Sequence, residues 1–322
     1  MTPLRITLLG AGAVGGYFGA PLAAAGHRVS VVARGATLET LRRDGLTLLM
    51  EGRRVNGPVQ AAEDGARFGP QDVVILAVKA PALPQVAQHV PPLLGPDTIV
   101  LPMLNGIPWW FFEGEQRLLR LDPDGALDKA IPRRQVVGAV VFPSLSCPQP
   151  GVTAHASGTR VVFGEPEGGT SERVQRVVDL FTQAGLSPEA STDIRREIWL
   201  KLLGNACFNP VSMITGSHTD DMLDDELIHE LFDGMMRELM AMGRALGIDA
   251  VVDPAARMAF SRKLGHIKTS MLQDVDAGRA VELDGILGAA VELAARLGIQ
   301  APLLKAVYAI GRRRARELGL YR

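Results

Sequence analysis

The chain has 322 residues, and its 34 Lys and Arg residues nearly balance 35 Asp and Glu residues, for a formal net charge of −1. A chain of this length exceeds the size at which single hydrophobic cores usually stop growing, so we expect two domains. The near-neutral charge gives no long-range field for gathering nucleic acid or anionic membrane. Cys147 and Cys207 lie far apart without metal-ligand spacing, which argues against a disulfide framework or a structural zinc.

No uninterrupted apolar run of the sequence reaches the roughly 18 residues of a membrane span. The basic run at residues 312–316 is interpreted as a solvated helix end. We therefore expect a soluble, cytoplasmic protein that binds a small molecule and has no nucleic-acid or membrane partner. A homodimer is a candidate assembly that the sequence does not test.

Residues 5 to about 190 alternate short β-rich runs with helical stretches, a pattern typical of a mostly parallel sheet covered by helices. The predicted strands are residues 6–9, 28–33, 73–78, 99–103 and 136–142. Two further runs, 152–155 and 160–163, are separated by Ser157-Gly158 and predict a hairpin at the sheet edge. The charged stretch 113–134 predicts a surface excursion.

Strand signals stop after about Asp193, and apolar residues then recur at helical spacing through nearly all of the remaining chain. The cluster Ser191-Thr192-Asp193 suits a loop that ends in a helix N-cap. We predict an α/β domain at residues 1–190 and an all-α domain at residues 191–322.

A glycine-rich turn follows the first predicted strand directly and opens a helical stretch. In a GxGxxG turn the first glycine makes the bend, the second lets the backbone approach a pyrophosphate, and the third lets helix and strand pack closely. The helix N-terminus then faces the phosphates. This context predicts a dinucleotide-binding, Rossmann-type N-terminal domain whose cofactor contacts are Gly10, Gly12, Ala13, Val14 and Gly15.

Three polar residues follow later strands of the predicted sheet. Arg34 ends the second strand, where NAD enzymes usually carry an acidic residue, and residues 29–38 contain no Asp or Glu. A guanidinium suits a 2′-phosphate, so Arg34 favours NADP over NAD. Lys79 and Asn105 follow the next two strands, and the carboxyl ends of such strands border the ligand crevice, so we expect both at the cofactor.

The start of the second domain carries a polar strip on an otherwise largely apolar helix. Lys201, Asn205 and Asn209 are spaced four residues apart and share one helix face. Asparagine is a poor helix former, so the strip favours a cavity wall over simple solvent exposure. An ammonium in a cavity wall can stabilise negative charge that develops on a substrate oxygen and can then protonate that oxygen. Lys201 is the best candidate for this role.

The sequence resembles the ketopantoate reductase (2-dehydropantoate 2-reductase) family, part of the wider 6-phosphogluconate-dehydrogenase-like group. The resemblance covers nearly the whole chain and rests on Gly10-Ala-Gly-Ala-Val-Gly-Gly16, Val78-Lys79, Leu104-Asn105-Gly106, Trp199-x-Lys201-x3-Asn205-x3-Asn209-Pro210, Ser270-Met-Leu-Gln-Asp274 and Val281-Glu282-x-Asp284.

The resemblance implies an NADPH-dependent reductase that makes pantoate from 2-dehydropantoate, a step of pantothenate biosynthesis. It assigns the proton donor to Lys201 and places Glu282 at the cofactor and in the catalytic set. Lys79 is assigned to the crevice shared by cofactor and substrate. The residues implied to hold the substrate are Asn105, Asn205, Asn209 and Ser270.

Two departures concern the substrate. The family reductases that make pantoate usually carry a further substrate asparagine shortly after the Asn-Pro motif, and its ungapped counterpart here is near Thr219. The segment Trp109-Trp110-Phe111-Phe112 is unusually aromatic. That segment predicts either a hydrophobic lid or interface patch or the wall of a site for a bulkier substrate. A related NADP-dependent dehydrogenase of another branched or aromatic 2-oxo or 2-hydroxy acid is therefore an alternative, and a non-catalytic NADP-binding sensor is a third.

No metal cluster is expected. Four of the histidines lack metal-ligand spacing with respect to one another: His155, His218, His229 and His266.

Overall fold

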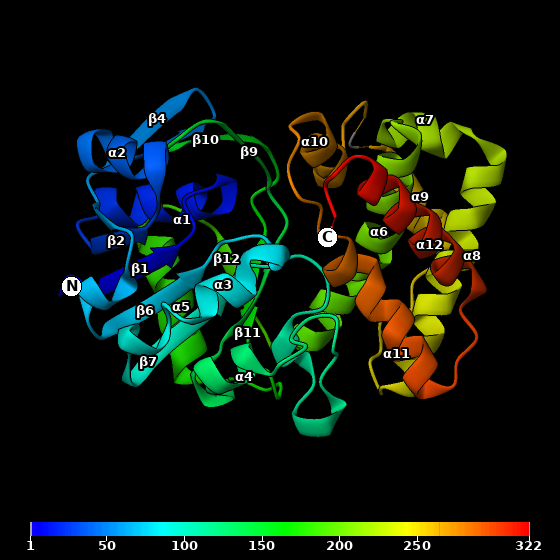
Figure 1. Cartoon of the computed structure of the whole chain (residues 1–322), viewed down its shortest axis with the longest axis horizontal. Helices are drawn as coiled ribbons and strands as arrows, with labels where there is room; N and C mark the ends of the chain where they lie inside the picture. Colours follow the sequence, from blue (N-terminus) through cyan, green and yellow to red (C-terminus); the bar gives the residue numbers. More distant parts are fainter. Residues whose placement is uncertain (1, 264, 322) are drawn as a thin grey trace. The chain divides into compact units, whose positions relative to one another are not determined.

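The computed structural model describes residues 2–263 and 265–321, which form two compact units. The first comprises the described residues of Met1–Leu104 and Asp124–Ile194, and the second those of Asn105–Pro123 and Arg195–Arg322. Figure 1 shows the strands of the first unit and the long helices of the second. The segment Asn105–Pro123 groups with the helical unit, which the sequence-based division at residues 190 and 191 did not anticipate.

The first unit is built on a five-stranded parallel sheet in the order β5-β2-β1-β6-β7. Its strands are β1 (Arg5–Leu9), β2 (Arg28–Val32), β5 (Gln60–Ala62), β6 (Gln71–Leu76) and β7 (Leu94–Pro102). Leu9 at the end of β1 is in register with Val32 of β2 and Leu76 of β6, so the carboxyl ends of the central strands are level. The predicted parallel sheet, and with it the Rossmann-type fold class, is confirmed.

Two smaller sheets complete this unit. One has the order β4-β3-β10-β9 and the other β12-β11-β8. Their strands are β3 (Leu46–Met50), β4 (Arg53–Gly57), β8 (Gly138–Val141), β9 (Ser144–Gln149), β10 (Val152–Ser157), β11 (Val161–Gly164) and β12 (Pro188–Ser191). The predicted hairpin of residues 152–155 and 160–163 is wrong, because β10 pairs with β9 and β3 while β11 pairs with β8 and β12.

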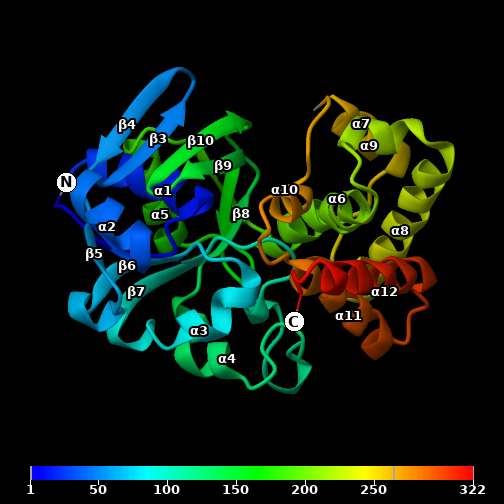
Figure 2. The ribbon, with the colours of Figure 1, turned by 45° about the horizontal axis from the view of Figure 1, so that its top comes forward.

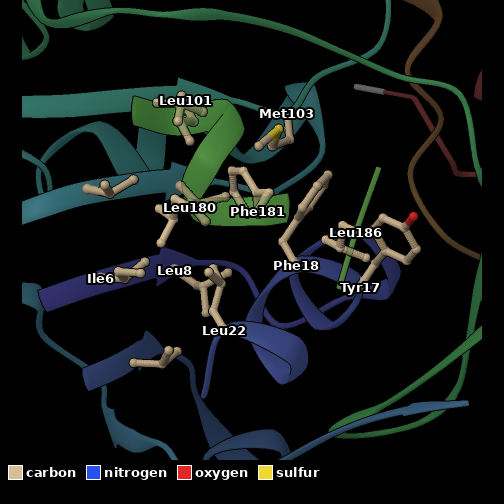
Figure 3. Packing of buried hydrophobic residues seen from close by; sticks show 14 of the residues in the cluster. Ile6, Leu8, Tyr17, Phe18, Leu22, Leu101, Met103, Leu180, Phe181 and Leu186 are labelled. Carbon is tan, nitrogen blue, oxygen red and sulfur yellow. The ribbon is translucent and has the colours of Figure 1, made fainter. Parts of the chain in front are cut away.

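Helix α1 (Ala13–Ala24) lies between two of these sheets (Figure 2). A Cβ on Gly19 would come within 2.7 Å of both Leu46 of β3 and Leu8 of β1, so the helix touches both strands closely. Phe18 of α1 packs edge-on against Phe181 at a ring distance of 5.1 Å, inside the apolar core that Figure 3 shows. The glycine-bearing helix is therefore held firmly by the core.

The remaining α-helices in the described part of this unit are α2 (Gly35–Asp44), α3 (Leu83–Ala87), α4 (Ala126–Ala130) and α5 (Glu172–Gln183). The predicted surface excursion at residues 113–134 is only partly a surface segment. Leu118, Leu127 and Ile131 are each buried, because apolar residues inside the charged stretch turn inward and anchor it.

In the described part of the second unit, every regular element is helical, which confirms the predicted all-α class. Its α-helices are α6 (Ile194–Thr215), α7 (Thr219–Asp224), α8 (Glu226–Ala245), α9 (Pro254–Arg262), α10 (Ser270–Asp276), α11 (Ala289–Leu297) and α12 (Pro302–Glu317). Helix α6 is central: the Trp199 indole donates to Leu239 of α8, Gly204 faces Arg257 of α9, and Met213 contacts Gly311 of α12. Among the described residues no helix combines the length and apolarity needed to cross a bilayer.

Candidate active site

Three glycines in the glycine turn of the first unit have different structural roles. Gly10 has a φ of +107°, which side-chain-bearing residues rarely adopt. A Cβ on Gly15 would lie 2.1 Å from the carbonyl oxygen of Gly10, so only glycine lets α1 start this close to the turn. A Cβ on Gly12, the N-cap of α1, would meet no described atom within 4 Å. The turn thus leaves an open approach beside Gly12, the position at which turns of this kind let the backbone come close to a pyrophosphate.

The helix that follows this turn presents the remaining predicted phosphate contacts. Ala13 and Val14 form the first turn of α1, and no side chain caps that helix end. Backbone N–H groups in the first turn of a helix have no partner inside the helix, and they suit an anion.

Arg34 and Lys79 extend the same edge of the sheet. Arg34 follows β2 and caps α2, while Lys79 follows β6, and both strands flank β1. A guanidinium nitrogen (Nη2) of Arg34 lies 3.4 Å from Nε2 of His89, whose Nδ1 lies 3.6 Å from a carboxylate oxygen of Asp64. Sequence reasoning missed His89, because only the fold brings it beside Arg34.

In the second unit, three of the predicted residues meet around one amide. The Lys201 ammonium donates to Oδ1 of Asn105 at 2.8 Å, and Nδ2 of Asn105 donates to Oε2 of Glu282 at 3.4 Å. Lys201 comes from α6, Asn105 from the segment after β7, and Glu282 from the segment after α10. The amide therefore links the lysine to a buried carboxylate.

The surroundings of Lys201 make it a better acid than an ordinary lysine. Although the residue retains some solvent exposure, the protein removes most of the water from its ammonium, and this burial lowers the pKa of Lys201 to about 8. The negative charge of Glu282 acts in the opposite direction and raises the pKa. At neutral pH the lysine is then mostly protonated, yet it gives up its proton far more readily than a surface lysine would.

A close backbone approach positions Asn105 and Glu282. Gly106 has a φ of +81°, and a Cβ on it would lie 2.0 Å from the carbonyl oxygen of Gly285. The N–H of Ile107 donates to that same carbonyl at 3.0 Å. Gly285 belongs to a π-helical turn, Asp284–Gly288, two residues after Glu282, and such turns are frequent at functional sites. Glycine at position 106 thus lets the asparagine loop dock beside the glutamate.

The other predicted substrate residues form a second contact on α6. Asn209 is buried, and its Nδ2 donates to Oγ of Ser270 at 3.3 Å. Asn205 lies one helical turn after Lys201 and one before Asn209, so the polar strip continues from the lysine to the serine. Thr219, near which the resemblance led us to expect a further substrate asparagine, is buried and donates its hydroxyl to the carbonyl of Ile267 at 3.2 Å.

The aromatic segment is neither an exposed lid nor an exposed interface patch. Trp109, Trp110 and Phe111 form a buried 3-10 helix, and the Phe111 ring lies 6.1 Å from that of Trp199 on α6. The guanidinium of Arg195 covers Phe111 at 4.2 Å. These rings fasten the segment that carries Asn105 to the helix that carries Lys201.

A Rossmann-type sheet with its glycine turn, followed by an all-α domain with an enclosed lysine, is the organisation of a two-domain oxidoreductase that uses a dinucleotide. Comparison with known families makes the class specific. Residues 6–168 match the family "Ketopantoate reductase PanE/ApbA", and residues 193–315 match its C-terminal domain. The chain belongs to the ketopantoate reductase family and is an oxidoreductase that acts on a keto group.

Individual relatives match nearly the whole chain. A 2-dehydropantoate 2-reductase of Mesorhizobium japonicum is 41% identical over 99% of this chain and 100% of its own length. A solved structure from Ralstonia solanacearum MolK2 is 44% identical, with a TM-score of 0.94 over 99% of this chain and 100% of its own. The 2-dehydropantoate 2-reductase of Methylococcus capsulatus is 28% identical, with a TM-score of 0.84 and 98% coverage of both chains.

Proposed function

We propose that this protein is an NADPH-dependent reductase of a small 2-oxo acid, and that 2-dehydropantoate is its substrate. The observation that carries the proposal is the cluster of Lys201, Asn105 and Glu282, with a lysine pKa of about 8. An acid whose pKa lies near the working pH is what the protonation of a developing alkoxide requires. The activity of the Mesorhizobium relative supports the same substrate.

The overall reaction converts a 2-oxo acid, NADPH and a proton into a 2-hydroxy acid and NADP⁺. NADPH, when bound, supplies the hydride that adds to the keto carbon. Lys201 stabilises the negative charge that grows on the keto oxygen and then transfers its proton to it. Asn105 holds the lysine through its amide oxygen, and Glu282 fixes the other end of that amide.

The polar strip of α6 is suited to binding the rest of the substrate. Asn205 and Asn209 offer amide donors, and Ser270 offers a hydroxyl, all of which pair well with a carboxylate or a substrate hydroxyl. The bond between Asn209 and Ser270 keeps those two groups together. A small, polar 2-oxo acid matches this set of donors better than an apolar ketone does.

In the first unit, Arg34 and Lys79 supply the positive charge for the cofactor. Arg34 stands at the end of β2, where the 2′-phosphate of NADPH would lie, and its planar guanidinium pairs with phosphate through two hydrogen bonds. Lys79 at the end of β6 adds a second cation on the other side of β1. This charge supports NADPH over NADH.

Thr219 is the reason to consider a second class of substrate. Its hydroxyl is already engaged with the backbone of Ile267, so the amide that the family usually offers near this point is missing. Another branched or aromatic 2-oxo acid is therefore the alternative. If 2-dehydropantoate is the substrate, the protein serves pantothenate biosynthesis in the cytoplasm.

The test is NADPH oxidation measured against a panel of 2-oxo acids that includes 2-dehydropantoate, with NADH as the comparison cofactor. We expect the highest kcat/KM for 2-dehydropantoate with NADPH. A higher kcat/KM for another 2-oxo acid would replace the substrate but keep the chemistry. Stoichiometric NADPH binding without turnover of any panel member would contradict the catalytic proposal and favour a sensor.

A further inference from the structure

Asp284 belongs to the same sequence motif as Glu282, but the proposed reaction gives it no role. Its carboxylate accepts the hydroxyls of two tyrosines: Tyr308 donates to Oδ1 at 2.6 Å, and Tyr321 donates to Oδ2 at 2.8 Å. Nη1 of Arg120 donates to the Tyr308 hydroxyl at 2.7 Å and lies 3.6 Å from Oδ1 of Asp284. Three segments that are far apart in the chain thus meet at the first residue of the π-helical turn.

Gly288, at the other end of the π-helical turn, leaves room for this convergence. A Cβ at this position would lie 2.6 Å from Oδ1 of Asp284, 2.9 Å from the Tyr308 ring and 3.1 Å from the Arg120 side chain. These distances are shorter than an ordinary van der Waals contact, so any side chain here would push the cluster apart. Burial and the nearby carboxylate raise the pKa of Tyr308 and of Tyr321, and both hydroxyls therefore remain donors.

A C-terminal cap on α12 brings Tyr321 to this carboxylate. Gly319 has a φ of +71°, and its N–H donates to the carbonyl of Arg316 at 3.0 Å. The N–H of Leu320 donates to the carbonyl of Ala315 at 2.9 Å, which completes the two bonds of a Schellman motif. This motif reverses the chain after the helix, so the residues that follow reach back to the π-helical turn.

The two residues that follow Gly319 contact the chain on both sides of Glu282. The carbonyl of Leu320 accepts the N–H of Val281, the residue before the glutamate, at 3.2 Å. The hydroxyl of Tyr321 bonds to the side chain two residues after the glutamate. The backbone of Glu282 is therefore restrained from both directions, and this limits how far its carboxylate can move.

Three guanidinium groups surround the two tyrosine rings. Arg120 and Arg312 lie 5.0 Å and 5.6 Å from the ring centre of Tyr308, and Arg316 lies 5.5 Å from that of Tyr321. Arginine stays charged throughout the pH range in which proteins are studied, so these charges do not change during a titration near pH 8. Replacing a tyrosine with phenylalanine keeps the ring under its guanidinium and removes only the hydroxyl.

We propose that one carboxylate and two tyrosines act together as positioning residues for Glu282: Asp284, Tyr308 and Tyr321. They restrain the backbone on which Glu282 stands, and so keep its carboxylate at the Asn105 amide, next to Lys201. The C-terminal end of the chain thereby helps to set the acid strength of the lysine. The inference rests on the proposed function, because that acid strength matters to the reaction only if Lys201 is the proton donor.

The size of the expected effect follows from Coulomb's law. A carboxylate that moves from about 5 Å to about 7 Å from an ammonium, at an effective dielectric constant of about 20, lowers the pKa of that ammonium by about 0.7. The Tyr321→Phe variant loses one of the two restraints. We therefore expect the pKa of Lys201 to fall from about 8 by roughly half a pH unit, less than on removal of the Glu282 charge.

The test is the titration of Lys201 in the full-length protein, followed by ¹³C NMR of labelled lysine, with Lys201→Ala to assign the signal. We expect the downward shift in Tyr321→Phe and, as a second variant, in Tyr308→Phe. In the Glu282→Gln background, Tyr321→Phe should cause no further shift, because the charge through which the tyrosine acts is gone. The titration needs no turnover, so a protein that reduces no 2-oxo acid would contradict the proposed function without deciding this inference, which the titration decides by itself.

The matched control is Tyr17→Phe, which alters the third tyrosine of the chain, on α1 in the first unit. The Tyr17 hydroxyl is buried and has no hydrogen-bond partner among the described residues, so its loss should leave the Lys201 titration unchanged. An unchanged Lys201 titration in Tyr321→Phe and Tyr308→Phe would overturn the proposal. An equal shift in the Glu282→Gln background would also overturn it, because the tyrosine would then act by another route.

Discussion

Replacing Glu282 with glutamine removes a negative charge and leaves a side chain of nearly the same shape. In the structure this charge raises the pKa of Lys201, while burial lowers it to a net value of about 8. Without the carboxylate, the effect of Glu282 on the pKa of Lys201 is lost, and the effect of burial, which lowers this pKa, remains. We therefore expect the pKa of Lys201 to fall below 8 in Glu282→Gln.

The size of the change can be bounded. An opposite charge within about 4–6 Å typically shifts a pKa by 1–3, and Glu282 reaches Lys201 through the single amide of Asn105. Taking the lower limit, the pKa falls from about 8 to about 7. At pH 8 the protonated fraction of Lys201 then drops from about one half to about one tenth, a roughly fivefold loss of the acid form.

The assay is the pH dependence of kcat/KM for NADPH-dependent reduction, which reports the ionisation of groups in the free enzyme. The unaltered protein should lose activity above about pH 8, because Lys201 gives up its proton there. In Glu282→Gln this decline should begin about one pH unit lower. The variant Asn105→Asp should move it the other way, since a carboxylate would replace the amide oxygen 2.8 Å from the ammonium.

If the variant turns over too slowly for kinetics, the pKa of Lys201 can be measured by direct titration. The chain has six lysines, few enough to follow by ¹³C NMR, with Lys201→Ala to assign the signal. An unchanged Lys201 titration in Glu282→Gln would refute the electrostatic coupling that we infer.

Three further predictions separate binding, folding and substrate positioning. Arg34→Ala should raise the KM for NADPH at least tenfold more than that for NADH, as expected for a lost charge-assisted pair, and equal losses would remove Arg34 from the 2′-phosphate. Gly15→Ala should lower the free energy of unfolding by about 1–3 kcal/mol, because its Cβ would overlap the Gly10 carbonyl oxygen. Gly12→Ala should fold normally, since its Cβ would meet no described atom within 4 Å, but it should bind NADPH poorly. Urea unfolding measures the stability of both glycine variants, and fluorescence titration measures their NADPH affinity. Asn205→Ala and Asn209→Ala should raise the KM for the 2-oxo acid more than they lower kcat, and steady-state kinetics would reveal the reverse pattern.

The sequence predicted four of the five strands of the central sheet because they carry a strong local signal, but it missed β5, and the predicted strand at residues 136–142 became β8 of a smaller sheet. The buried runs that became β1, β2, β6 and β7 are apolar and bounded by turn residues. Pairing in the smaller sheets was less predictable. The strand β10 joins β3, more than a hundred residues earlier, and local pattern alone cannot show such a partner.

In the candidate site, too, the local features were predictable from the sequence and the long-range contacts were not. The spacing of Lys201, Asn205 and Asn209 on one helix face was visible in the sequence, because helical periodicity is local. The contact between Gly106 and Gly285 was not, since it depends on two backbones that meet only after folding. The position of His89 beside Arg34 was hidden for the same reason.

The central claim is that Lys201 donates the proton in the reduction of a 2-oxo acid. The most direct measurement compares kcat at saturating 2-dehydropantoate, or at the best substrate of the panel, for the unaltered protein and Lys201→Ala. NADPH affinity is measured in parallel by fluorescence titration. We predict a kcat lower by at least about a hundredfold, the usual scale for losing a positioned acid, with NADPH affinity little changed. A near-normal kcat at saturating substrate, with only KM raised, would contradict the assignment and leave Lys201 as a substrate anchor.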